Sequence, residues 1–286
     1  MSDFIDFHVH PPVEALLSGP IAPYLGPLST RTGTDPEILT TDEVASRYRE
    51  RNGRAVLLGW DTETITKRRP FSSEDVAAMV SAHPDVFYGF GSIDPARGAR
   101  AVAGVHSAAR LGLSGLAFHP VGQGFDPASR AAFAIYETAS EHGMVCLFHT
   151  GSSRLGAGMP GGSGLLLSHG DPRAVDDVAA AFPDLQIVIA HVGRLWRDEA
   201  VAVTAHKSNV WLNLVGVDAA AFAADAAELD DERCLFGSDW FFASLDEALA
   251  GWGPGSIDEA TRQRLLFGNA DRLLESSITR AELGRS

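Results

Sequence analysis

Residues 4–10 read FIDFHVH, a largely apolar run that ends in two histidines, His8 and His10. Continuous runs of this kind are typical of strands that are buried on both faces, as in parallel sheets. Side chains at positions i and i+2 of a strand point to the same face, so His8 and His10 can present two imidazole rings to one ion. Val9 then faces the other way, as an apolar residue can.

Three more histidines and one aspartate follow apolar runs in the same manner. They are His119 in LAFHP, His149 in CLFHT, His191 in IVIAH and Asp239 after RCLFGS. If these runs are parallel strands, all six side chains lie at one rim of one sheet, where such folds build their sites. We take the other histidines as structural, because they lie in expected helices or loops: His83, His106, His142, His169 and His206.

Eight strand-like runs can be counted, and helix-like stretches separate them. The expected strands span residues 3–9, 54–60, 86–92, 113–119, 144–150, 186–191, 210–215 and 233–238. The expected helices span residues 42–51, 73–83, 95–111, 127–142, 171–182, 197–207, 217–228 and 257–275. Eight β-then-α units close naturally into a (β/α)8 TIM barrel, and a chain of 286 residues suits one such domain, residues 1–286. An open doubly wound sheet is the alternative, although GxGxxG is absent after the first strand.

Two connections depart from a minimal barrel. The first βα loop, about residues 11–53, is far longer than usual, and we expect it to fold over the catalytic end. The second, about residues 151–170, follows His149 and contains RLGAGMPGGSG. Its glycines permit a mobile lid or a close approach to a ligand, and a plain flexible connection explains them equally well.

The composition excludes several classes of protein. It is 45% hydrophobic and 21% charged, as in soluble globular proteins, and 37 acidic against 23 basic residues give a net charge of −14. Such a charge disfavours nucleic acid and anionic membranes as partners. No apolar run could span a membrane and no signal peptide is visible, so we expect a cytoplasmic protein. Cys146 and Cys234 lie in strand-like runs and are expected to be buried thiols.

The convergent residues predict a metal-dependent enzyme. Neutral imidazole suits zinc, manganese or iron, and a carboxylate such as that of Asp239 leaves room for a water ligand. A divalent ion lowers the pKa of that water and polarises a carbonyl oxygen. We expect one divalent ion, with Zn2+ as first choice and Mn2+ or Fe2+ as alternatives.

The motifs IDFHVHPP, GLAFHPVGQGF, CLFHTG, IVIAHVG, RCLFGSDW and LFGNADRLL resemble the amidohydrolase-related family of metal-dependent TIM barrels, in family order from residue 3 to about residue 274. That family includes aminocarboxymuconate-semialdehyde decarboxylase, resorcylate-type decarboxylases and hydrolases of lactones or carbon–carbon bonds. The resemblance implies His8, His10, His149 and Asp239 as metal ligands. It implies His191 as the catalytic acid–base, with Asp239 as a ligand that also handles a proton.

One departure from the family pattern bears on the number of ions. Ala117 stands where many relatives have a lysine, which argues against a modified lysine bridging two ions. The resemblance therefore implies one metal. It also allows a homodimer, because barrels of this family are often dimers.

Substrate contacts are expected from His119, Arg154, Arg194 and Trp240. Guanidinium groups near a metal suit a carboxylate or an enolate, and an indole can wall a planar group. Each of these residues can equally be explained as a rim or packing residue, and His119 can simply close a strand before proline. The expected partner is a small molecule that bears a carboxylate or a carbonyl.

Two reactions use the same residues. The first is hydrolysis, in which a metal-activated water cleaves a lactone, an amide or a β-dicarbonyl C–C bond, and the intact HxH pair favours it. The alternative is non-oxidative decarboxylation of an aromatic or unsaturated keto or hydroxy acid. A barrel that binds metal without catalysis is the third hypothesis, since fold does not fix function.

Overall fold

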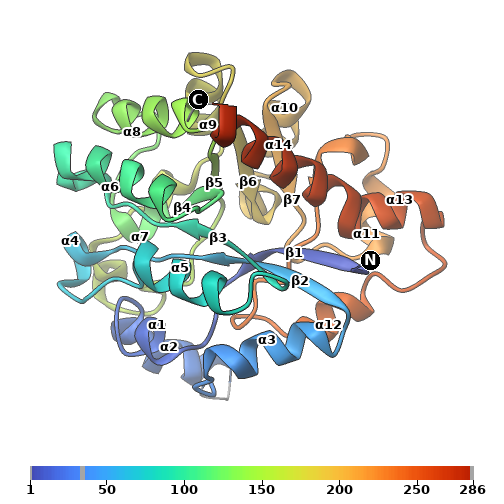
Figure 1. Ribbon diagram of the computed structural model, residues 1–286, viewed down its shortest axis with the longest axis horizontal. Coiled ribbons are helices and arrows are strands. Elements are labelled where there is room, and N and C mark those ends of the chain that lie inside the picture. The colour runs from blue at the N-terminus through green and yellow to red at the C-terminus, as the bar shows by residue number, and fades with distance from the viewer. Residues whose placement is uncertain (1, 33–35, 284–286) are drawn as a thin grey trace.

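The computed structural model describes residues 2–32 and 36–283, and a barrel of eight parallel strands occupies its middle (Figure 1). The strands follow one another in the order of the sequence, and all eight runs predicted as strands form them. Their bounds are β1 (Phe4–Val9), β2 (Gly53–Leu58), β3 (Phe87–Gly91), β4 (Gly115–Phe118), β5 (Val145–His149), β6 (Gln186–Ala190), β7 (Val210–Asn213) and β8 (Cys234–Leu235). The TIM-barrel prediction is confirmed.

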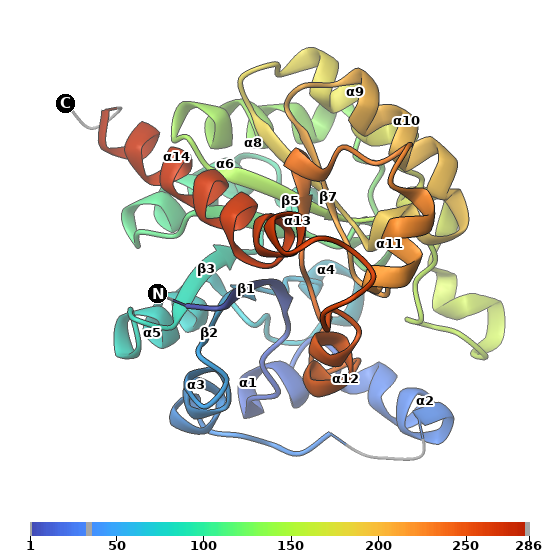
Figure 2. The same ribbon diagram turned by 90° about the vertical axis from the view of Figure 1, so that its right-hand side faces the viewer.

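Helices surround the strands, as both ribbon views show (Figures 1 and 2). The longer ones are α2 (Ala22–Thr32), α3 (Thr41–Arg49), α5 (Ser73–Ala82), α6 (Ala99–Arg110), α8 (Arg130–Glu141), α9 (Arg173–Ala181), α10 (Arg197–His206), α11 (Ala219–Asp225) and α14 (Asn269–Leu283). The shorter ones are α1 (Glu14–Leu17), α4 (Glu63–Thr66), α7 (Pro120–Gln123), α12 (Leu245–Ala250) and α13 (Glu259–Gln263). Each of the eight predicted helical stretches overlaps at least one of these helices.

Local sequence signals fix where two of the helices begin. The side chains of Thr40 and Ser72 each accept a hydrogen bond from a backbone N–H in the first turn of the helix. In return, the carboxylates of Glu43 and Asp75 accept the backbone N–H of Thr40 and Ser72. These capping boxes satisfy amide groups that a helix leaves without partners. They start α3 and α5 where the sequence predicts.

The barrel closes between its last and first strands. The Phe7 N–H donates to the carbonyl of Phe236 at 2.9 Å, and the Asp239 N–H donates to the carbonyl of His8 at 3.0 Å. Inside the barrel lies a compact apolar core that includes Ile5 and Phe7. A second and larger core lies between the strands and the helices.

The first connection is more ordered than a loop. Between β1 and β2 the chain forms α1, α2 and α3, and both ribbon views show α12, from far along the chain, on the same side of the barrel (Figures 1 and 2). An ion pair from Arg51 to Asp246, with 2.6 Å between Nε and Oδ1, links the end of α3 to α12. This long insertion therefore packs beside the segment that follows β8.

Two further predictions concern the chain as a whole. Both cysteines, Cys146 and Cys234, are buried free thiols, as predicted. Within the described ranges, no helix is both long enough and apolar enough to cross a membrane.

Candidate metal centre

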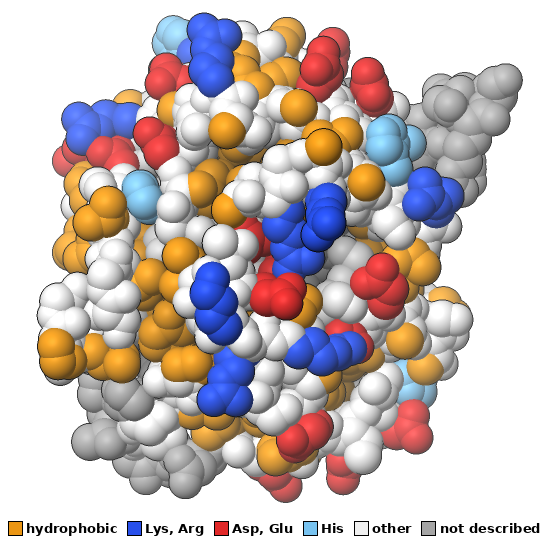
Figure 3. All heavy atoms as spheres, turned by 90° about the vertical axis from the view of Figure 1, so that its left-hand side faces the viewer, with side chains coloured by type: hydrophobic (Ala, Val, Ile, Leu, Met, Phe, Trp, Pro, Cys, Tyr) orange, Lys and Arg blue, Asp and Glu red, His pale blue; other side chains and the backbone are white. Residues whose placement is uncertain are grey.

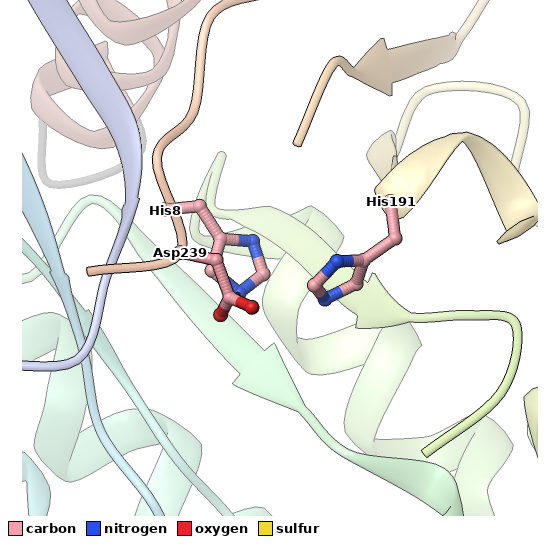
Figure 4. A group of neighbouring side chains, drawn as sticks. All are labelled: His8, His191 and Asp239. Atoms are coloured by element: carbon pink, nitrogen blue, oxygen red, sulfur yellow. Dashed lines mark ion pairs between the residues drawn. The ribbon is translucent and has the colours of Figure 1, made fainter. Parts of the chain in front are cut away.

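The ends of the strands meet at the face where α4 and α7 follow β2 and β4 (Figure 1). His8 and His10 lie at the end of β1, His191 begins the short 3-10 helix η4 (His191–Trp196) after β6, and Asp239 follows β8. Figure 4 shows His8 and Asp239 side by side, with the ring of His191 facing them across a gap. The sequence predicted that these strand ends converge, and in the structure they do.

Distances at the rim match those expected around one ion. His8 Nε2 lies 3.2 Å from His10 Nε2, and these two atoms lie 3.7 and 3.8 Å from Asp239 Oδ1. One ligand atom each from His8, His191 and Asp239 also lie within 4.8 Å of one another. Tetrahedral zinc with bonds near 2 Å separates its ligands by roughly 3.3 Å. The first three atoms need to move by only a few tenths of an ångström to reach that separation.

Several buried nitrogens at the rim have no hydrogen-bond partner among the described residues. They include His149 Nε2 and both ring nitrogens of His191. A buried polar atom without a partner is costly, and native structures hold few of them. A divalent ion would satisfy such nitrogens, so the residues present fit the group that the sequence predicts.

Burial keeps the imidazole rings neutral, as a metal requires. It lowers the pKa of His8 to about 3, and it lowers the pKa values of His10, His149 and His191 well below the usual range, helped by repulsion among the rings. For Asp239, burial raises the pKa of the carboxyl group to about 7, although the charges of Arg194 and Arg154 oppose the shift. The rim therefore combines neutral nitrogen donors with a carboxyl group that titrates near neutrality.

Metal binding should depend on pH through Asp239. A bound ion needs the carboxylate form, so below about pH 7 a proton competes with the ion, and the affinity should fall by about tenfold per pH unit. Above pH 7 the affinity should be constant, because the histidines are already neutral. Competition titrations with Zn2+ from pH 8 to pH 5.5 test this. A flat profile down to pH 6 contradicts it, and a slope of two or three protons would mean that histidines also titrate.

His119 and His149 stack at the ends of β4 and β5. Their ring centroids are 3.9 Å apart with 13° between the planes, and the His149 ring lies 4.4 Å from that of His191. His119 Nδ1 accepts the N–H of Gly122 at 3.0 Å, and burial lowers the pKa of His119 to about 4. A neutral ring with an acceptor at Nδ1 carries its proton on Nε2. His119 can thus donate a hydrogen bond into the site.

The turn after β6 is held in an unusual conformation. His191, Val192 and Arg194 all have positive φ, at 62°, 48° and 44°. Gly151 packs against this turn: its own φ is +82°, and a Cβ there would lie 2.6 Å from the carbonyl of Gly193. Non-glycine residues with positive φ are costly and cluster at functional sites. Gly151 is thus needed for this close approach to the backbone of the turn.

Arg154 and Arg194 lie at the mouth without ion-pair partners. Both line a small cavity of about 40 Å3 together with His10, His191 and Asp239. Neither has a carboxylate within 4.0 Å among the described residues, unlike Arg51 or Arg97. Figure 3 shows Lys and Arg side chains around the middle of this face, in a chain whose net charge is −14. The two free guanidinium groups make the cavity suitable for an anion.

Trp240 lies outside the cavity that holds Asp239. It packs 6.0 Å from the Tyr48 ring, beneath the guanidinium of Arg47, and lines a neighbouring cavity of about 570 Å3. The aromatic walls of the metal cavity are Trp60 and Phe242, whose rings lie 5.0 and 5.4 Å from that of His10. Phe242 lies on the chain beyond Asp239, and no pattern in the sequence distinguishes it from Phe241.

Comparisons with known proteins agree with this fold. A family model described as amidohydrolase matches residues 5–275. A search of curated proteins found no match.

Three solved structures illustrate the similarity. An uncharacterised TIM-barrel protein from Bordetella bronchiseptica has 23% identity and a TM-score of 0.79, covering 96% of this chain and 99% of that one. The 5-carboxyvanillate decarboxylase from Sphingomonas paucimobilis has 17% identity and a TM-score of 0.67, with the same coverage. A dihydroxybenzoic acid decarboxylase from Polaromonas, solved with manganese and the inhibitor 2-nitroresorcinol, has 17% identity and a TM-score of 0.69, covering 96% and 97%. At these identities, the similarity shows the shared fold.

Proposed function

The chain belongs to the amidohydrolase family, and from this membership we propose that it is a metal-dependent decarboxylase of a small aromatic or unsaturated hydroxy or keto acid. Two observations support this proposal over the hydrolysis that we expected first. Similar solved structures include decarboxylases of substituted benzoic acids, one of them with manganese. The cavity also offers two unpaired guanidinium groups beside Asp239.

The arginines carry the proposal, because they match the chemistry of the substrate. Decarboxylation requires a carboxylate at the site, and guanidinium groups bind carboxylates through paired hydrogen bonds. The flat walls of Trp60 and Phe242 suit a planar substrate, and the unpartnered Nε1 of Trp60 can donate a hydrogen bond to it.

A single divalent ion would be held by His8, His10 and Asp239, with His149 as the fourth ligand, and would polarise a substrate oxygen. Mn2+ gains weight beside Zn2+, because two of the similar decarboxylase structures contain bound manganese. His191 faces the same gap as His8 and Asp239 (Figure 4). We assign it to proton transfer, the role that the family resemblance implies, although one of its ring nitrogens lies within 4.8 Å of ligand atoms of His8 and Asp239.

The remaining task of the site is to move one proton. When the bond between the carboxyl group and the substrate carbon breaks, CO2 leaves and the electron pair stays on that carbon. A proton must then take the place of the carboxyl group. His191 and Asp239 both border the cavity, so they are the groups placed to deliver that proton.

Hydrolysis is the second candidate. The intact pair of His8 and His10 favours it, as does the carboxyl group of Asp239 at the border of the cavity, where it can accept a proton from water. Product analysis distinguishes the two reactions. Metal-loaded protein is incubated with carboxyl-13C-labelled dihydroxybenzoates and with lactones. Release of 13CO2 supports the proposal, whereas products heavier by one water, without CO2, would support hydrolysis instead.

The roles of His149 and His191 can be separated by substitution. His149→Ala should lower the metal content of the purified protein, because a ligand is lost. His191→Ala should retain the metal and lower kcat by about 100-fold, the usual contribution of a positioned acid or base. Elemental mass spectrometry and initial rates on both variants test this assignment. Metal loss in His191→Ala with full occupancy in His149→Ala would reverse the two roles.

A further inference from the structure

Strand β1 contains a β-bulge between Asp6 and Val9, at the first of the two histidines proposed as metal ligands. Asp6 pairs with Ala55 of β2, whereas Val9 pairs with Leu57, so three steps along β1 match two steps along β2. The extra residue changes which face each side chain occupies. Phe4 belongs to the outer core, Ile5 and Phe7 to the core inside the barrel, and Val9 again to the outer core.

The bulge is what turns the two histidines inward. In a regular strand every second residue faces the same way, so His8 and His10 would face outward with Phe4 and Asp6. Because one residue is inserted, they line a cavity together with Leu58 and Leu147, whose side chains belong to the inner core. Bulges at barrel rims commonly redirect a side chain in this way.

The carboxylate of Asp6 accepts hydrogen bonds from both segments that carry proposed ligands, β1 and the turn at residues 238–240. Its Oδ1 accepts the N–H of His8 at 3.2 Å and the N–H of Ser238 at 2.9 Å. Its Oδ2 accepts the hydroxyl of Ser238 at 2.5 Å and that of Tyr48 at 2.9 Å. The Ser238 hydroxyl in turn accepts the N–H of Trp240 at 2.9 Å. One fully buried side chain therefore spans the bulge in β1 and the turn at residues 238–240.

A carboxylate is an unusual choice for this place. Asp6 is buried beside the outer core, next to Tyr48. A charged group there must be desolvated, and without its four donors it would cost far more than an apolar side chain. Asp239 follows Ser238 directly, at a φ of 62°, and its N–H donates to the carbonyl of His8. The bonds of Asp6 thus hold the backbone on both sides of the proposed ligands.

We propose that Asp6 is a positioning residue for the metal centre: by pinning the β1 bulge to Ser238, it sets the separation between the imidazoles of His8 and His10 and the carboxylate of Asp239. This inference rests on the proposed metal site. Asp6 itself does not contact the ion. Its expected effect is on how tightly, and in what geometry, the ion is held.

Four variants test the inference, with Zn2+ and Co2+ as probes. Asp6→Ala and Ser238→Ala should each weaken Zn2+ binding by about tenfold or more, as is usual when a group that orients ligands is lost. Both should change the visible absorption of the Co2+-loaded protein. Asp6→Asn should restore most of the affinity, because its amide oxygen can still accept both N–H groups and the two hydroxyls can turn to accept.

Tyr48→Phe is the matched control. It removes a bond to the same carboxylate, but from α3 and not from a segment that carries a ligand. Its Zn2+ affinity should stay within about twofold of the wild type even if its Tm falls. If Asp6→Ala does not fold, Ser238→Ala decides the question.

Two results would overturn the inference, and they differ. Wild-type Zn2+ affinity in folded Asp6→Ala and Ser238→Ala protein would refute the role of Asp6 and leave the metal site standing. A wild-type chain that binds neither Zn2+ nor Co2+ would refute the proposed metal site, and the inference with it.

Discussion

Replacement of Asp239 by asparagine is expected to remove activity and most of the metal affinity together. The carboxylate lies 3.7 and 3.8 Å from Nε2 of His8 and His10, and its pKa is raised to about 7. An amide of the same shape cannot supply a negative charge to the ion or exchange a proton near neutrality. We expect kcat to fall by about 1,000-fold, within the range for a lost acid–base group, and the purified variant to lose its metal.

Asp94→Asn provides the matched control for this substitution. Asp94 is likewise a carboxylate beyond a strand end and is fully buried, but it accepts the N–H groups of Ala96 and Thr64 and lies outside the metal cavity. Its substitution should affect stability while metal content and kcat stay near wild type. Full metal content and at least a tenth of wild-type kcat in Asp239→Asn would contradict the role given to Asp239.

The second large effect is expected at the mouth of the cavity. Arg154→Met and Arg194→Met should each lower kcat/KM for a carboxylate substrate by about tenfold, and the double variant by about 100-fold, since a hydrogen bond to a charged group contributes 1.5–3 kcal/mol. The effect should appear mainly in KM, because both side chains are exposed and act on the bound acid. Steady-state kinetics of the three variants measure it.

Arg130→Met serves as the control for charge alone. Arg130 lies over the ring of Phe133 on α8 and does not line the metal cavity. Its loss changes the net charge by the same amount without removing a contact at the mouth. Equal effects from Arg130→Met and Arg154→Met would show that general electrostatic attraction, and not a local anion site, explains the change.

Periodicity and strand ends were sufficient to predict the barrel and the convergence of its histidines. The sequence placed His8 and His10 on the same face, because side chains at positions i and i+2 of a strand share a face, whichever face that is. The bulge that makes this face the inner one could not be predicted, since it depends on Asp6 bonding to Ser238, 232 residues away. Long-range hydrogen bonds leave no local periodic signal.

The orientation of the aromatic residues after β8 also could not be predicted from the sequence. Trp240 was expected to contact substrate because it follows Asp239, yet the positive φ of Asp239 accompanies a turn that leaves Trp240 against Tyr48. Phe242 faces His10 instead. The predicted strand 233–238 is likewise shorter in the structure, where β8 spans Cys234–Leu235 and the Ser238 N–H donates to the side chain of Asp6 and not to a strand.

We expect the rim to hold one catalytic divalent ion. The metal content of tag-free protein that has never met a chelator, measured by elemental mass spectrometry beside Asp239→Asn, tests this expectation. We predict about one equivalent of zinc, manganese or iron per wild-type chain and much less in the variant. No metal in the wild type, even after incubation with each of these ions, would contradict the claim.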